Sequence, residues 1–153
     1  MDRNVRRGEA DDAEAIGRLL HEFNSEFDEP TPGPGRLTER VRQLLADSEI
    51  TVLLGGSSPD GLAVLRFRPD IWTQGFECYL AELYVVPAHR GQGLGRALMR
   101  AAIELARGEG AEYMYLGTGE EDSAARALYE SLGFSPRGGE PDGPVMLFYE
   151  REL

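Results

Sequence analysis

Lysine is absent from this sequence, because all 16 basic residues among its 153 are arginines. The chain therefore has no side-chain amine to form a Schiff base, to act as a phosphate-loop lysine or to be acylated. Its single cysteine, Cys78, cannot form an internal disulfide, which favours a cytoplasmic protein. No apolar run approaches the roughly 20 residues needed to span a bilayer, and no secretory signal precedes the acidic start of the chain. Neither a membrane nor an oxidising compartment is expected.

Positive charge is also scarce, since 27 acidic residues outnumber the 16 arginines and give a net charge of −11. Such a balance argues against nucleic-acid binding, which needs a basic surface to displace counterions. An acidic field favours cationic small molecules or basic peptides, although it can also serve solubility alone. The length fits one domain over residues 1–153.

One stretch combines a strand, a glycine turn and a helix. An apolar run over Tyr79–Val86 is followed by three glycines in five residues and then by helical apolar spacing over Leu94–Arg107. Glycines leave the backbone N–H groups uncrowded, and the start of a helix favours negative charge. The stretch therefore predicts an anion cradle, most simply for a phosphate or pyrophosphate.

Two familiar phosphate motifs do not fit this turn. The mononucleotide loop G-x-x-x-x-G-K-[ST] requires a lysine, and the chain has none. The dinucleotide fingerprint G-x-G-x-x-G/A fails at its third position, which is Arg96 counted from Gly91 and Leu98 counted from Gly93. What does fit, from Arg90 to Gly95, is R-x-x-G-x-G.

The order of predicted elements indicates an α/β fold. It runs strand, two helices, three strands, helix, strand, helix and strand. Neighbouring hairpin strands should be antiparallel, and the two strands joined through the glycine turn and its helix should be parallel. We therefore expect a single-domain, mixed, largely antiparallel central sheet flanked by helices. The strands are expected near residues 4–8, 50–54, 61–67, 77–86, 112–116 and 145–150, and the helices near 11–23, 38–46, 94–107 and 122–132.

From about Leu80 to Phe134 the chain resembles the GNAT superfamily of acyl-CoA-dependent N-acetyltransferases. The matching motifs are the strand Leu83–Val86, the R-x-x-G-x-G turn, the next strand and the run Ala127–Phe134. The resemblance implies that acetyl-CoA binds between splayed parallel strands. Backbone groups of Val85 and Val86 would hold its pantetheine amides, and Arg90, the first residue of the motif, would be a cofactor-binding residue. The backbone N–H groups of the glycine loop would bind the pyrophosphate. The loop residues are Gly91, Gln92, Gly93, Leu94, Gly95 and Arg96. Asp122 stands where the family often has a cofactor-binding asparagine.

Two side chains are candidates for the proton transfers that acyl transfer to an amine requires. Glu82 is out of character in an apolar strand and could act as a base, or it could simply pair with an arginine or face solvent. Glu77 and Glu120 are alternative bases. Periodicity alone places Tyr129 in the core, whereas the resemblance implies that it protonates the departing thiolate.

The acceptor is less defined than the donor. Phe27 lies in an acidic Pro/Gly-rich loop, and Trp72 either caps the edge of the core or lines a ligand pocket, so Phe27, Trp72 and Glu82 are candidate substrate-binding residues. The stretch Trp72–Val86 resembles that of diamine acetyltransferases. A small cationic amine, an aminoglycoside or a peptide N-terminus would suit the charge. No metal-ligand spacing is present. A non-catalytic acyl-CoA-binding module is the alternative function, and a homodimer through the final strands is conceivable.

Overall fold

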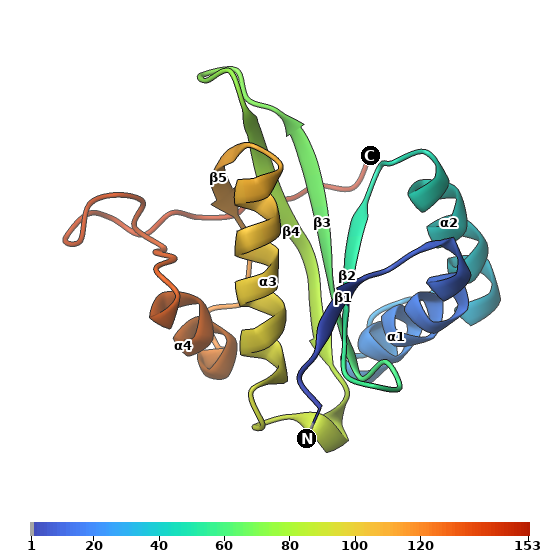
Figure 1. The fold of residues 1–153 in the computed structure, drawn as a ribbon. Coiled ribbons are helices and arrows are strands. Elements are labelled where there is room, and N and C mark those ends of the chain that lie inside the picture. The colour runs from blue at the N-terminus through green and yellow to red at the C-terminus, as the bar shows by residue number, and fades with distance from the viewer. Residues whose placement is uncertain (1) are drawn as a thin grey trace. The chain divides into compact units, whose positions relative to one another are not determined.

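The computed structural model describes residues 2–153, which form two compact units: residues up to Met114 and residues from Tyr115 onward. Figure 1 shows their helices and strands. In chain order these are β1 (Val5–Arg7), the 3-10 turn η1 (Ala10–Asp12), α1 (Ala13–Glu26), α2 (Pro34–Ala46), β2 (Thr51–Gly55), β3 (Gly61–Pro69), β4 (Phe76–Val85), the 3-10 turn η2 (Pro87–His89), α3 (Leu94–Gly108), β5 (Ala111–Tyr115) and α4 (Ser123–Ser131).

A five-stranded sheet in the order β1-β2-β3-β4-β5 is the centre of the fold. The first four strands pair antiparallel with their neighbours in sequence. The N–H of Phe76, which begins β4, donates to the carbonyl oxygen of Gly110, just before β5, at 3.2 Å. Both strands therefore begin at the same end and run in parallel, with α3 as their connection. The predicted mixed, largely antiparallel sheet is confirmed.

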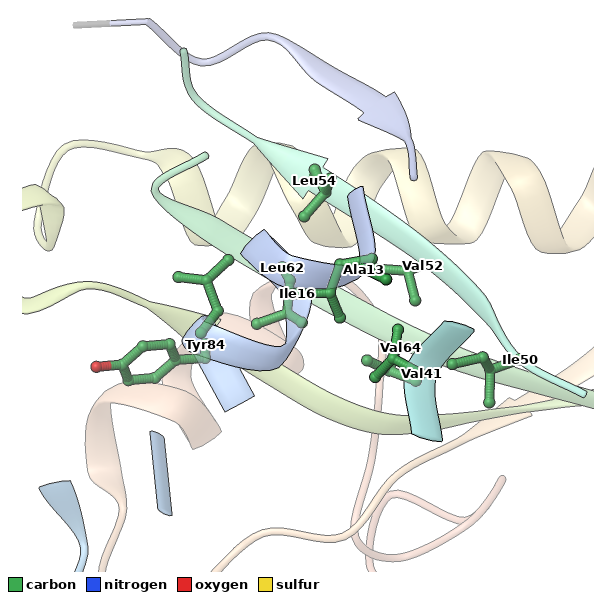
Figure 2. Close-up of a cluster of buried hydrophobic side chains, with 10 residues drawn as sticks. Ala13, Ile16, Val41, Ile50, Val52, Leu54, Leu62, Val64 and Tyr84 are labelled. Carbon is green, nitrogen blue, oxygen red and sulfur yellow. The ribbon is translucent and has the colours of Figure 1, made fainter. Parts of the chain in front are cut away.

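Apolar side chains cover both faces of the sheet within the first unit. Helices α1 and α2 pack on one face, and α3 packs on the other (Figure 1). Figure 2 shows the core under α1 and α2, where Tyr84 of β4 lies beside the β3 side chains. This core contains Ala13, Ile16, Leu19, Val41, Ile50, Val52, Leu54, Leu62, Val64 and Tyr84. Because Tyr84 comes two residues after Glu82, the strand that carries the candidate base is held firmly against α1 and α2.

The first two helices are longer than their apolar spacing predicts. α1 continues to Glu26, and α2 begins at Pro34, within the stretch 24–35 expected to be a loop. Proline suits the first turn of a helix, where its missing N–H would have no partner in any case. None of the helices in residues 2–153 is long and apolar enough to cross a bilayer.

The prediction of a final strand over residues 145–150 is wrong. No strand forms there, and the side chains of Leu147, Phe148 and Tyr149 are exposed. The N–H of Met146 donates instead to the carbonyl oxygen of Pro136 at 2.8 Å. Residues of high β-propensity form a strand only when a neighbouring strand supplies hydrogen bonds and packing, and the sequence pattern does not report that partner. The predicted homodimer rested on this strand and loses that basis.

Candidate active site

The glycine turn after β4 forms a cradle of backbone donors. Gly91 and Gly93 have φ angles of +74° and +89°, in the left-handed region that glycine adopts without strain. Gly93 is the N-cap of α3 and provides no side-chain cap. The first intrahelical bond runs from the N–H of Ala97 to the carbonyl oxygen of Gly93, at 3.0 Å. This bond begins the helical ladder, and the glycine turn before it fits an anion such as a pyrophosphate.

Arg90 turns away from this cradle and toward the fold. Its Nη1 lies 2.7 Å from Oε2 of Glu26, and its Nη2 donates to Oε1 of the same carboxylate at 2.8 Å. Its Nε donates to the carbonyl oxygen of Val85 at 2.9 Å. All three nitrogens of the guanidinium therefore tie the loop to the end of α1 and to the end of β4. This geometry supports a positioning role for Arg90 within the loop.

A row of aromatic rings extends from this ion pair. The hydroxyl of Tyr84 donates to Oε1 of Glu26 at 3.0 Å, and the guanidinium of Arg90 lies 5.5 Å from the centroid of the Tyr84 ring. Phe23 stacks on Tyr84 with centroids 4.9 Å apart, and Phe27 meets Phe23 edge-on at 5.6 Å. Phe27 thus continues an aromatic row from the core, and its own side chain is 55% exposed. It remains a candidate for contact with an acceptor.

Replacing Glu26 by Gln is expected to lower the free energy of unfolding at pH 7 by about 1–2 kcal/mol, because a bidentate charge-assisted pair is lost. Arg90 holds the pKa of Glu26 below its ordinary value of 4.5. The stabilisation should therefore be complete above pH 4.5 and disappear as the pH falls through the lowered pKa of the folded state. Urea unfolding of both proteins at several pH values measures this.

Glu22→Gln is the matched control, since Glu22 forms an exposed pair with Arg18 on the same helix. Such surface pairs typically contribute under 1 kcal/mol. Equal effects of the two substitutions, or a Glu26 effect that persists well below pH 4.5, would contradict a structural role for the Glu26–Arg90 pair.

The end of β4 presents different backbone groups at Val85 and Val86. The N–H of Val86 donates to the carbonyl oxygen of Asp60 at 2.9 Å, and its carbonyl oxygen accepts from the N–H of His89 at 2.9 Å. In an antiparallel ladder the next residue points its N–H and C=O the opposite way, so those of Val85 face away from β3. Of the two residues expected to bind pantetheine, only Val85 presents its N–H at that edge, and its carbonyl oxygen there accepts from Nε of Arg90.

A β-bulge sets the orientation of Glu82. Val64 pairs with Glu82 and Leu65 pairs with Leu80, so Ala81 is the extra residue on β4. Bulges of this kind redirect side chains and often occur beside active sites. Glu82 lies on the same face as its partner Val64, which belongs to the core under α1 and α2.

The surroundings of Glu82 suit a general base. Its carboxylate is partly buried and, among residues 2–153, makes no hydrogen bond or ion pair. Burial raises its pKa above the ordinary value of 4.5, and the positive charge of Arg66 opposes that rise. A carboxylate with a raised pKa that is free to accept a proton is suited to general-base chemistry.

The two alternative bases have less suitable surroundings. Glu77 forms an ion pair with Arg68 on β3, and Glu120 is exposed in the second unit.

Trp72 lies in the turn between β3 and β4, with its side chain 90% exposed. Six strand residues separate Glu82 from the start of β4, a distance of roughly 20 Å. The structure therefore neither packs Trp72 as a core cap nor brings it near Glu82.

Tyr129 and Asp122 belong to α4 in the second unit. Oδ1 of Asp122 accepts from the N–H of Ala125 at 3.1 Å and caps this helix. The ring of Tyr129 meets Phe134 edge-on with centroids 6.2 Å apart. Burial and, secondarily, the carboxylate of Asp122 raise the pKa of Tyr129 to about 12. The phenol therefore stays protonated at neutral pH, as a proton donor must.

A cavity of about 340 Å³ opens at the far end of the sheet from the glycine loop. Phe67 and Phe76, from the paired ends of β3 and β4, line it together with Arg7, Glu9 and Glu109. None of the predicted site residues is among its lining residues, so the cavity does not mark the candidate site.

A model of the acetyltransferase (GNAT) family matches residues 16–134. The chain belongs to the GNAT acetyltransferase family. Among solved structures, an Arthrobacter sp. FB24 protein assigned to the acetyltransferases superposes on this GNAT protein with a TM-score of 0.90. The two are 44% identical, and the match covers 98% of this chain and 96% of that chain.

Two other relatives are named after the compounds that they acetylate. This GNAT protein is 33% identical over 91 residues to the streptothricin acetyltransferase of Streptomyces lavendulae, a match covering 59% of this chain and 46% of the relative. An aminoglycoside acetyltransferase, HMB0005, from an uncultured soil metagenomic sample shares the fold with a TM-score of 0.77 at 22% identity, over 98% of this chain and 97% of that chain. The chain spans less than half the length of the first curated relatives it matches.

Proposed function

We propose that this GNAT protein moves the acetyl group of acetyl-CoA to a primary amine by direct transfer within a ternary complex. The observation that carries the proposal is the arrangement of β4 and its following loop. The strand bears a carboxylate with a raised pKa at its bulge, and the same strand leads into a turn whose backbone N–H groups fit a pyrophosphate.

Each residue has one task in this proposal. The N–H groups of residues 94–96 bind the pyrophosphate, and Arg90 holds their loop in place. The backbone of Val85 faces the pantetheine arm, and its N–H is the donor available for the negative charge that develops on the carbonyl oxygen. Acetyl-CoA, when bound, supplies the acetyl group as a thioester.

Proton transfer is assigned to two side chains. As the amine nitrogen bonds to the acetyl carbon and the carbon–sulfur bond breaks, Glu82 accepts the proton from the amine, directly or through water. Tyr129 donates a proton to the departing sulfur. Cys78 takes no part, because it is buried and burial raises the pKa of its thiol to about 11.

The acceptor we propose is a small cationic amine. The net charge of −11 favours cations, and the relatives include a streptothricin acetyltransferase and an aminoglycoside acetyltransferase. Phe27, at the end of the aromatic row, is the residue assigned to contact it.

Thiol release from acetyl-CoA tests this function. The panel would contain an aminoglycoside, streptothricin, a linear polyamine and a basic peptide with a free N-terminus, with glutamate as an anionic amine control. We expect amine-dependent release with at least one cation and none with glutamate. Tight binding of CoA without turnover of any amine would instead support a non-catalytic acyl-CoA-binding module.

A further inference from the structure

A second arginine, remote from the motif in sequence, lies against the glycine cradle. Nε of Arg3 donates to the carbonyl oxygen of Gln92 at 2.6 Å. A Cβ built on Gly93 would lie 3.2 Å from Nε of Arg3 and 3.5 Å from its Cζ. The guanidinium therefore rests directly beside the N-cap of α3, where the backbone donors of the cradle begin.

The two Nη groups of Arg3 are available to a ligand. Among residues 2–153 they make no hydrogen bond, and Arg3 has no carboxylate within ion-pair distance, whereas Arg6 and Arg7 pair with Asp12 and Glu109. The Arg3 side chain is also exposed. A guanidinium held by one nitrogen, with its other two free, can offer two parallel donors to a phosphate.

Besides Arg96 in the first turn of α3, the turn's own motif offers only Arg90, whose charge is paired with Glu26. A helix N-terminus contributes the equivalent of only about half an elementary charge, and a pyrophosphate is a multiply charged anion. Glu26 neutralises Arg90, the sequence contains no lysine, and the protein as a whole carries a net charge of −11. A cation beside the cradle offsets this unfavourable field.

We propose that Arg3 binds the pyrophosphate of the acyl-CoA donor through its Nη groups and so completes the cradle of α3. This inference rests on the proposed function for the identity of the anion. It assigns to Arg3 a charge–charge contact with the donor, whereas the guanidinium of Arg90 is paired with Glu26. Its Nε bond to Gln92 holds the guanidinium in place for that contact.

Calorimetric titration of the full chain with CoA, which binds without reacting, tests the assignment. Arg3→Gln keeps an amide that can donate to Gln92 but removes the charge, and we expect CoA to bind about tenfold more weakly. Arg3→Lys keeps the charge and should lose less. Arg7→Gln, which removes the same charge from the adjoining strand away from the loop, should leave the affinity within twofold of the wild type.

Dephospho-CoA, which lacks the ribose 3′-phosphate, separates the two phosphate sites of the donor. We expect the loss caused by Arg3→Gln to be the same for CoA and dephospho-CoA, and to shrink as salt is added. A loss seen with CoA alone would move the contact to the 3′-phosphate and overturn the assignment. Equal affinity of Arg3→Gln and wild type would also overturn it while leaving the proposed function intact. If the wild-type protein does not bind CoA, the proposed function fails first.

Discussion

Glu82→Gln is expected to lower kcat for the best amine by about 10²- to 10⁴-fold, the usual contribution of a general base. Gln occupies nearly the same volume but cannot accept the proton of the amine at neutral pH. Because Glu82 belongs to the acceptor half of the reaction in the proposal, the affinity for CoA should stay close to that of the wild type. Steady-state kinetics and calorimetric titration with CoA measure the two effects separately.

The pH profile gives an independent test of Glu82. The base must be ionised to act, so kcat/KM should fall as the solution becomes acidic enough to protonate it. Since burial raises the pKa of Glu82, this acid limb should lie above pH 4.5. In Glu82→Gln the limb should vanish, leaving a low rate that does not depend on pH in this range.

Glu77→Gln is the matched control because Glu77 lies on the same strand and pairs with Arg68. It should reduce kcat less than about threefold, as expected of a residue outside the chemistry. Glu82→Gln should also unfold at the same or a higher temperature than the wild type at pH 7, because burial disfavours the ionised form of Glu82 in the folded state. Loss of activity together with a large loss of stability would indicate a structural role for Glu82.

Tyr129→Phe is the second large effect, and we expect kcat to fall by about 10²-fold, near the lower end of general-acid contributions. A phenol whose pKa is about 12 is a weak acid toward an ordinary thiolate, whose pKa is about 8.5. Transfer becomes better matched if the departing sulfur is itself desolvated, because desolvation disfavours the thiolate and raises the pKa of a thiol. Tyr149→Phe, at an exposed position in the same unit, should have no effect on kcat.

Two measurements separate an acid role of Tyr129 from a packing role. First, the Tyr129-dependent part of kcat should persist up to about pH 11, because the phenol loses its proton only near pH 12. Second, an acetyl donor with a more acidic aromatic thiol needs no protonation of its leaving group. The Tyr129→Phe defect should therefore shrink with such a donor, and a defect of unchanged size would rule out proton donation to sulfur.

Local patterns in the sequence predicted the elements that later carry the site. The switch from an apolar strand to helical spacing, with glycines between them, placed the end of β4, the glycine turn and the start of α3 correctly. Glu82 was singled out because a carboxylate is rare in an apolar strand. Its raised pKa is consistent with its selection as a candidate base. These features depend on neighbours within a few residues, and short-range periodicity reports such neighbours well.

Long-range contacts were beyond the reach of the same patterns. Arg90 and Glu26 are 64 residues apart, and Arg3 and Gln92 are 89 apart. No spacing rule connects such positions, so the sequence could not show that Arg90 pairs with Glu26 or that Arg3 lies beside Gly93. The final strand failed for a related reason, because a strand depends on a partner elsewhere in the chain.

By itself, the sequence determined the chemistry available to this protein. It has no lysine, it is strongly acidic, and it carries the glycine turn and tyrosine helix through which it resembles the GNAT family. The tertiary structure decided which side chains surround the cradle. It turned Arg90 toward Glu26, brought Arg3 to Gly93 and placed Glu82 at a bulge beside the core. The physical reason is that charge, hydrogen bonding and desolvation act through space, whereas sequence patterns record only neighbours along the chain.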